Sequence, residues 1–219
     1  MKIRSGWTSW TQAIRQKRRA SNCFASAERF ARLSMRIRHA RPGDELAIAE
    51  VHVSSWRTTY SGILPSGVLE NLSIESRRAA WRLRIEDTIR NPQAYALFVA
   101  EEGGKLTGFV NGGKERAFHP EFDAELYAIY LVESAQRAGT GSKLTLELLR
   151  FFQENGFRKM RVWVLAENPS RQFYERMGGS RCGEKSEKFG NEAFTEIAYG
   201  YDVENLTNTL RERLLRLPD

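Results

Sequence analysis

Residues 136–143, QRAGTGSK, separate an apolar segment, ELYAIYLV (125–132), from a helix-like segment, LTLELLRFF (144–152). Glycines between a strand and a helix allow the backbone to adopt angles that a side chain would disfavour. Successive N–H groups of such a loop, together with the partial positive charge of a helix start, form a site suited to phosphate. The loop and its flanking segments therefore indicate an α/β fold, and the loop is one that could bind an anion.

Two common phosphate-binding loops do not fit this segment. A Walker A loop requires a glycine upstream of Gly-Lys-Ser/Thr, whereas here the lysine follows Gly141 and Ser142. A dinucleotide fingerprint requires a third glycine where Leu144 stands. The remaining pattern is Gln136-x-x-Gly139-x-Gly141, which by itself is more often a simple connection than a ligand site.

The periodicity of the remaining chain alternates between that of helices and that of strands. Strands are predicted over residues 35–44, 94–102, 106–113, 124–132, 159–166 and 192–203. Helices are predicted over residues 45–56, 74–91, 142–156, 168–179 and 204–217, with residues 62–73 as a loop and no element over 180–191. This order indicates one α/β domain with a mixed sheet.

Three helices carry more detailed predictions. Asp44 is placed to cap the helix over residues 45–56. The side chains predicted to face inward from residues 74–91 are Ala79, Ala80, Trp81, Leu83 and Ile85. For residues 142–156 the predicted inward side chains are Leu144, Leu148, Phe151 and Phe152.

The net charge of +7 is concentrated at the amino terminus. Residues 1–34 hold eight basic residues and one acid, Glu28, so the rest of the chain is neutral overall. We therefore expect no nucleic-acid partner for the main domain. Residues 1–34 are interpreted as a basic extension, for which three explanations stay open: a flexible or upstream-start segment, a transit peptide, or an arm for a polyanion. The main domain is placed at residues 35–203, and a helical tail at 204–219.

Composition gives further expectations. No apolar run approaches the roughly 20 residues that span a bilayer, so no membrane partner is expected. The two cysteines, Cys23 and Cys182, stand in unrelated contexts, which fits a reducing, cytoplasmic location. The three histidines are scattered, so we predict no metal site.

The glycine loop, the preceding ELYAIYLV and the later LAENPSRQFYERMGG (165–179) together resemble the GNAT family of N-acetyltransferases. The resemblance covers nearly all of residues 35–203. It implies a mixed, mostly antiparallel sheet whose central strands splay apart and are flanked by helices. It also implies acetyl-coenzyme A as cosubstrate and a primary amine of a small molecule or peptide as acceptor.

The resemblance extends to individual cofactor-binding residues. The pyrophosphate loop would comprise Gln136, Arg137, Ala138, Gly139, Thr140, Gly141 and Ser142. The main chain of Ile129, Tyr130 and Leu131 would bind the pantetheine arm, which would pair like an added strand. Asn168 would bond the pantetheine amides, and Tyr174 would lie near the thioester sulfur.

Acetyl transfer to an amine needs a base for the ammonium and an acid for the leaving thiolate. Glu125 is the candidate base because it is an acid on an otherwise interior strand; the alternative is a carboxylate paired with an arginine. Tyr174 is the candidate acid; the alternative is a core tyrosine whose hydroxyl meets a carbonyl. The alternative to an enzyme is a non-catalytic module that senses acyl-coenzyme A.

The acceptor pocket is the part of the site that the sequence constrains least. Trp56 and Tyr60 lie where the family's first helix and the following loop shape that pocket, although Trp56 could simply pack the helix on the sheet. Trp81 is expected to be a packing residue, and His119 a surface residue of a loop. The last strand and terminal helix offer a surface for a possible homodimer.

Overall fold

The computed structural model describes residues 35–216, so the predicted extension over residues 1–34 lies outside the described part of the chain. The strands are β1 (Arg36–His39), β2 (Tyr95–Glu102), β3 (Lys105–Lys114), β4 (Ala124–Leu131), β5 (Lys159–Leu165), β6 (Ser180–Phe189) and β7 (Glu192–Asp202). The helices are α2 (Glu45–Thr59), α3 (Ser66–Glu70), α4 (Ile74–Arg90), α5 (Thr140–Glu154), α6 (Arg171–Arg176) and α7 (Val203–Leu215), with a short 3-10 turn, η1 (Glu133–Ala135).

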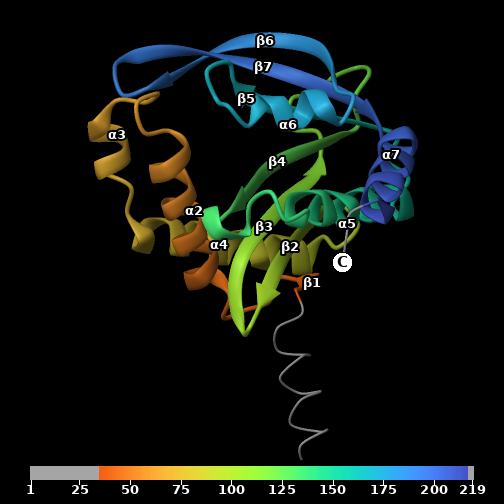
Figure 1. The fold of residues 1–219 in the computed structure, drawn as a ribbon, viewed down its shortest axis with the longest axis horizontal. Coiled ribbons are helices and arrows are strands. Elements are labelled where there is room, and N and C mark those ends of the chain that lie inside the picture. The colour runs from red at the N-terminus through yellow and green to blue at the C-terminus, as the bar shows by residue number, and fades with distance from the viewer. Residues whose placement is uncertain (1–34, 217–219) are drawn as a thin grey trace, which may run out of the picture.

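The strands form one mixed sheet in the order β1-β2-β3-β4-β5-β7-β6 (Figure 1). Among the described strands, β4 and β5 are the one parallel pair, and all other neighbours are antiparallel. The parallel pairing covers only Ala124–Leu126 against Met160–Val162, after which the two strands separate. The predicted mixed sheet with splayed central strands is therefore confirmed.

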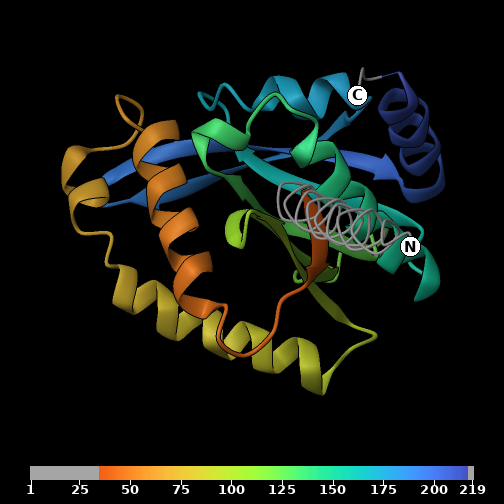
Figure 2. The same cartoon turned by 60° about the horizontal axis from the view of Figure 1, so that its bottom comes forward.

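Helices cover both faces of the sheet (Figures 1 and 2). On one face, α5 packs over β2, β3 and β4, and the larger hydrophobic core lies there. The side chains predicted to face inward from this helix, Leu144, Leu148, Phe151 and Phe152, are all buried. Helix α7 packs against α5 and contributes Val203, Leu206 and Leu210 to the same core, so the segment expected as a tail is part of the domain.

The opposite face carries α2 and α4, which enclose a second core around Ile48, Trp81 and Phe109. Within α4, Trp81 and Ile85 are buried, as predicted. Ala79, Ala80 and Leu83 are exposed, contrary to prediction, because α4 presents only a narrow stripe to α2 and the sheet.

A β-bulge in β4 decides which of its side chains face each core. Asn111 of β3 pairs with Ala128 and Gly112 pairs with Leu126, so Tyr127 has no partner and the alternation of side chains shifts by one. The residues of β4 in the α5-side core are Ala124 and Leu126 before the bulge, and Ile129 and Leu131 after it. Ala128 and Tyr130 pack in the α2–α4 core, and alternation places Glu125 on that same face.

Several predicted elements were wrong. Residues 62–73, expected as a loop, contain the short helix α3, and residues 180–189, for which no element was predicted, form strand β6. The helix expected over residues 168–179 is reduced to the six residues of α6.

The carboxylate of Asp44 does not cap α2. It accepts a bidentate pair from the Arg38 guanidinium and a bond from the Arg41 N–H. None of the helices in residues 35–216 is long and apolar enough to cross a membrane.

Candidate active site

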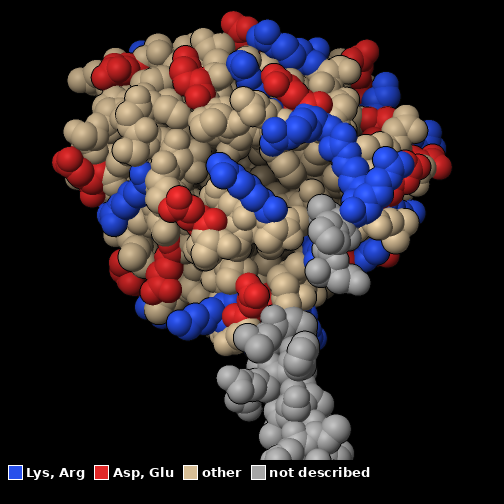
Figure 3. Space-filling view, in the orientation of Figure 1, with Lys and Arg blue, Asp and Glu red and all other residues tan. Residues whose placement is uncertain are grey.

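A cleft of about 1050 Å³ opens where β4 and β5 separate. Figure 3 shows the hollow at the centre of one face, with Lys and Arg side chains gathered at its rim. Its lining includes the following predicted site residues: Trp56, Tyr60, Glu125, Ile129, Tyr130, Leu131, Gln136, Arg137, Gly139, Gly141, Ser142, Asn168 and Tyr174. Ala138 and Thr140 belong to the same loop but do not line the cleft.

The glycine loop ends at the start of α5 with its N–H groups free. Arg137 and Gly139 have positive φ angles of 62° and 79°, and the first bond of α5 runs from the Lys143 N–H to the Gly139 carbonyl. Within the described residues, the N–H groups of residues 137–142 have no hydrogen-bond acceptor. Four of these residues line the cleft, Arg137, Gly139, Gly141 and Ser142, and free N–H groups at the positive end of a helix form a site for an anion.

Beyond the bulge, β4 has no neighbouring strand on the side of the cleft. The Val132 N–H donates to the Thr107 carbonyl, so this residue points toward β3, and alternation turns Ile129 and Leu131 the other way. The Leu131 carbonyl accepts a bond from the Ser55 hydroxyl at 2.8 Å, which agrees with that direction. Of the three residues expected to offer main-chain bonds, Ile129 and Leu131 face the cleft, whereas the main chain of Tyr130 faces β3.

Tyr174 of α6 is buried at the cleft and 7% exposed. Its hydroxyl has no hydrogen-bond partner among the described residues, so the alternative in which it meets a carbonyl does not apply. Burial raises the pKa of Tyr174, which keeps the phenol protonated at neutral pH. The phenol of Tyr174 is therefore protonated at neutral pH and has no hydrogen-bond partner in the described part of the chain.

Asn168 and Tyr60 lie together beside Tyr174. The Asn168 amide donates to the Tyr60 hydroxyl at 3.2 Å, and its carbonyl accepts from the Ser170 N–H at 2.8 Å. Burial raises the pKa of Tyr60, so this phenol also stays neutral. These two bonds use one N–H and one oxygen lone pair of the Asn168 amide, so a second N–H and a second lone pair stay available for a ligand.

An aromatic wall on the α2 side closes the cleft. The rings of Trp56 and Tyr60 lie 4.9 Å apart, and the Arg77 guanidinium lies 5.6 Å from the Trp56 ring. Behind them the His52 ring stacks on Tyr130 at 5.0 Å and accepts a hydrogen bond from the Trp81 indole at 3.0 Å. Sequence reasoning missed His52, although a histidine inside the apolar stripe of a helix was a signal that could have found it.

The end of the cleft where β4 and β5 meet is charged. Glu125 is 2% exposed, and its carboxylate forms an ion pair with Arg116. This is the arrangement of the alternative considered for Glu125, and it leaves the carboxylate at the cleft. Burial opposes the charge of Arg116, but the bond with Glu125 raises the pKa of the guanidinium overall.

A second ion pair, Glu115 with Arg161, is buried beside the first. Burial alone would raise the pKa of Glu115, but the His119 N–H and Arg161 lower it below its ordinary value. His119 does not line the cleft. In residues 35–216, no three His, Cys, Asp or Glu side chains come together as metal ligands would.

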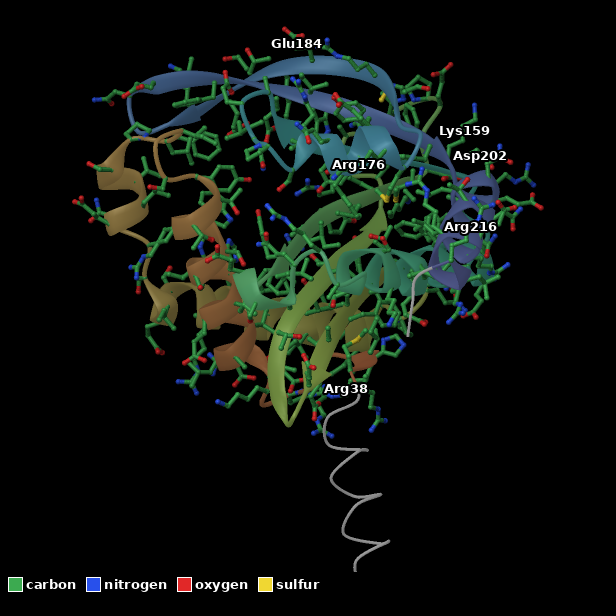
Figure 4. All side chains as sticks on the ribbon, in the orientation of Figure 1. Arg38, Lys159, Arg176, Glu184, Asp202 and Arg216 are labelled. Carbon is green, nitrogen blue, oxygen red and sulfur yellow. The ribbon has the colours of Figure 1, made fainter. Side chains whose placement is uncertain are left out.

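Positive charge also surrounds the glycine-loop end of the cleft. Arg176, labelled on α6 in Figure 4, and Arg213 of α7 line the cleft together with Arg137. None of these three forms an ion pair within the described residues. This end of the cleft is therefore suited to a ligand with several negative charges.

Known proteins similar to this chain were found both with a family model and among individual sequences. The family model described as "Acetyltransferase (GNAT) family" matches residues 56–179. The uncharacterised N-acetyltransferase YuaI of Bacillus subtilis is 35% identical over 178 residues, which cover 81% of this chain and 98% of that protein.

Solved structures share the fold. The PaiA N-acetyltransferase of Thermoplasma acidophilum, in complex with coenzyme A, has a TM-score of 0.58 and 22% identity, covering 77% of this chain and 99% of its own. The putative acetyltransferase YncA of Salmonella typhimurium, with acetyl-coenzyme A, has a TM-score of 0.57 and 22% identity, covering 77% and 94%.

Proposed function

Because the chain belongs to the GNAT family of acetyltransferases, we propose that it transfers the acetyl group of acetyl-coenzyme A to a primary amine of a small molecule or peptide. The amine attacks the thioester directly, and the thiolate of coenzyme A leaves. Two related proteins named above were solved with coenzyme A or its acetyl form, which supports this choice of cosubstrate. A cytoplasmic location and a homodimer stay predictions.

The free N–H groups of residues 137–142 carry the proposal. They are donors without acceptors at the start of α5, and they fit the diphosphate of the cosubstrate. Arg137 adds a charge-assisted contact, and Arg176 and Arg213 provide further positive charge. The open edge of β4 at Ile129 and Leu131 would pair with the amide groups of the pantetheine arm, with Asn168 opposite.

The chemistry assigns separate roles to the remaining residues. Glu125 accepts the proton of the ammonium, directly or through a water, because it is the buried carboxylate at the junction of β4 and β5. Tyr174 donates a proton to the leaving thiolate, since its hydroxyl is protonated and unengaged. Each of these steps contributes on the order of 10²–10⁴ in rate. Trp56 and Tyr60 would form the wall of the acceptor pocket.

Two measurements test the proposal. Isothermal titration calorimetry with coenzyme A and acetyl-coenzyme A should detect binding of both, and free thiol should appear when amines are added with the acetyl form. If neither coenzyme A nor acetyl-coenzyme A gives a heat of binding, the proposed function is refuted. Binding without thiol release across a broad amine panel would favour the non-catalytic sensor instead.

A further inference from the structure

The face of the sheet that carries Glu125 also carries charged residues of the neighbouring strands. In β5, Met160, Val162 and Val164 belong to the α5-side core, so Arg161 and Trp163 lie on the opposite face. Arg161 is the register partner of Glu125. The junction of β4 and β5 therefore presents a charged floor toward α2, away from the glycine-loop helix.

The ion pair between Arg116 and Glu125 is asymmetric. The Glu125 side chain is 3% exposed, whereas that of Arg116 is 53% exposed and covers the Tyr127 ring at 4.5 Å. Both residues line the cleft. The cation is thus the exposed member of the pair, and the carboxylate is the buried one.

This arrangement has a consequence for an acceptor amine. An amine arrives as an ammonium ion, and approaching Glu125 brings it next to the guanidinium that already holds this carboxylate. A simple amine would either be repelled by Arg116 or displace the guanidinium into solvent, and displacement gives up the ion pair between Arg116 and Glu125. An acceptor that supplies its own carboxylate would satisfy both charges at once.

We propose that the acceptor is a zwitterion of the α-amino-acid type, whose carboxylate binds Arg116 while its amino group lies next to Glu125. A planar guanidinium can keep one bond to Glu125 and offer its other N–H groups to a second carboxylate. The inference rests on the proposed function, because it names the substrate class of the same site.

The other groups lining this part of the cleft agree with such a substrate. Glu196 is already paired with Lys185 at 3.0 Å, and Lys185 lies 4.6 Å from the Trp163 ring. An acceptor with several positive charges would therefore find both carboxylates of this region already engaged. Trp56 and Tyr60 provide an apolar surface for the side chain of the substrate.

The experiment compares three amines that share the side chain of leucine in the thiol-release assay at pH 8: L-leucine, L-leucinamide and 3-methylbutylamine, which lacks the carboxyl group. We expect kcat/KM for leucine to exceed that for each of the others by at least about tenfold, which corresponds to about 1.4 kcal/mol. The amino group of leucinamide is less basic, so more of it is neutral at this pH. That bias works against the expected order and makes the test stricter.

Substitution of Arg116 tests the residue itself. In Arg116→Gln the ratio of kcat/KM between leucine and leucinamide should fall toward one, chiefly through KM for leucine, and Arg116→Lys should restore part of it. Arg150→Gln is the matched control, because Arg150 pairs with Glu147 on the exposed side of α5 outside the cleft and should keep the wild-type ratio. Circular dichroism checks that each variant is folded.

The outcomes separate the inference from the proposed function. Equal use of the three amines, or the wild-type ratio retained in Arg116→Gln, would overturn the inference while acetyl transfer stands. Turnover of none of the three would also overturn it. Calorimetry with acetyl-coenzyme A and a wider amine panel would then decide whether the proposed function falls too.

Discussion

Protonation of His52 should make the stability of this protein depend on pH in a calculable way. The imidazole is 7% exposed, stacks on Tyr130 of the cleft wall and accepts a hydrogen bond from the Trp81 indole. Burial, with a smaller effect of the Arg77 charge, lowers the pKa of His52 to about 3. Because Nδ1 is the acceptor, the neutral ring carries its proton on Nε2, which has no partner in the described structure.

The linkage between proton binding and folding gives the sign and size of this pH dependence. In the unfolded chain a histidine has a pKa of about 6.5, so between pH 6.5 and 3 the unfolded state binds a proton that the folded state does not. The free energy of unfolding therefore falls as the pH decreases, by about 1.4 kcal/mol per pH unit. His52 alone accounts for a loss of about 2 kcal/mol at pH 5 and about 5 kcal/mol below pH 3.

The variant His52→Asn isolates this contribution, since the amide oxygen can accept from the Trp81 indole and does not titrate. Urea unfolding of both proteins at pH 7.5, 6 and 5 gives the difference in the free energy of unfolding at each pH. The variant is expected to be less stable at pH 7.5 because it leaves a cavity. That deficit should shrink by about 2 kcal/mol at pH 5. A deficit that stays constant with pH would refute the reasoning.

Three further predictions concern the cleft and its supports. Tyr174→Phe should lower kcat in the thiol-release assay by on the order of 10² or more, with the dissociation constant of acetyl-coenzyme A unchanged; an unchanged kcat would show that Tyr174 is not the acid. Gly139→Ala should weaken coenzyme A binding at least about tenfold in calorimetry, because alanine disfavours the φ of 79° by about 1–2 kcal/mol. Gly156→Ala, with a φ of 80° beyond α5, is its control and should cost stability but leave affinity intact. Gly112→Ala should lower the free energy of unfolding by about 1–3 kcal/mol in urea, since its Cβ would lie 2.7 Å from the Leu148 side chain.

Elements that bury an apolar face could be predicted from the sequence, and elements that bury none could not. The face of α5 repeats leucine and phenylalanine at helical spacing, and each of these side chains is buried. Strand β6 has almost no buried side chain, lies at the edge of the sheet and reads SRCGEKSEKF, which alternates no apolar residues. It exists because it pairs along the length of β7, and such pairing leaves no pattern in its own side chains. Helix α3 likewise has no buried residue and follows Pro65 in a stretch rich in turn residues.

The candidate site likewise has parts that could be predicted from the sequence and parts that could not. Loop chemistry at residues 136–142 is local, so spacing alone predicted a glycine turn between a strand and a helix, although the helix begins at Thr140 and not at residue 142 as predicted. The partners of Glu125 and Asn168 are not local: Arg116 comes from the loop after β3, and Tyr60 lies 108 residues away from Asn168. These contacts depend on how the strands are ordered, which the sequence of each strand does not specify.

The bulge at Tyr127 connects the two halves of the proposed chemistry. Without the bulge, alternation along β4 would place Glu125, Ile129 and Leu131 on one face of the sheet. The extra residue instead turns the side chains of Ile129 and Leu131 into the α5-side core and leaves Glu125 facing α2. One strand can thus offer its main-chain edge to a cosubstrate held at the start of α5, while presenting a carboxylate to an acceptor that enters from the α2 face. Because strand separation begins at the same point, after Leu126, the thioester and the amine would meet where the two faces become accessible to each other.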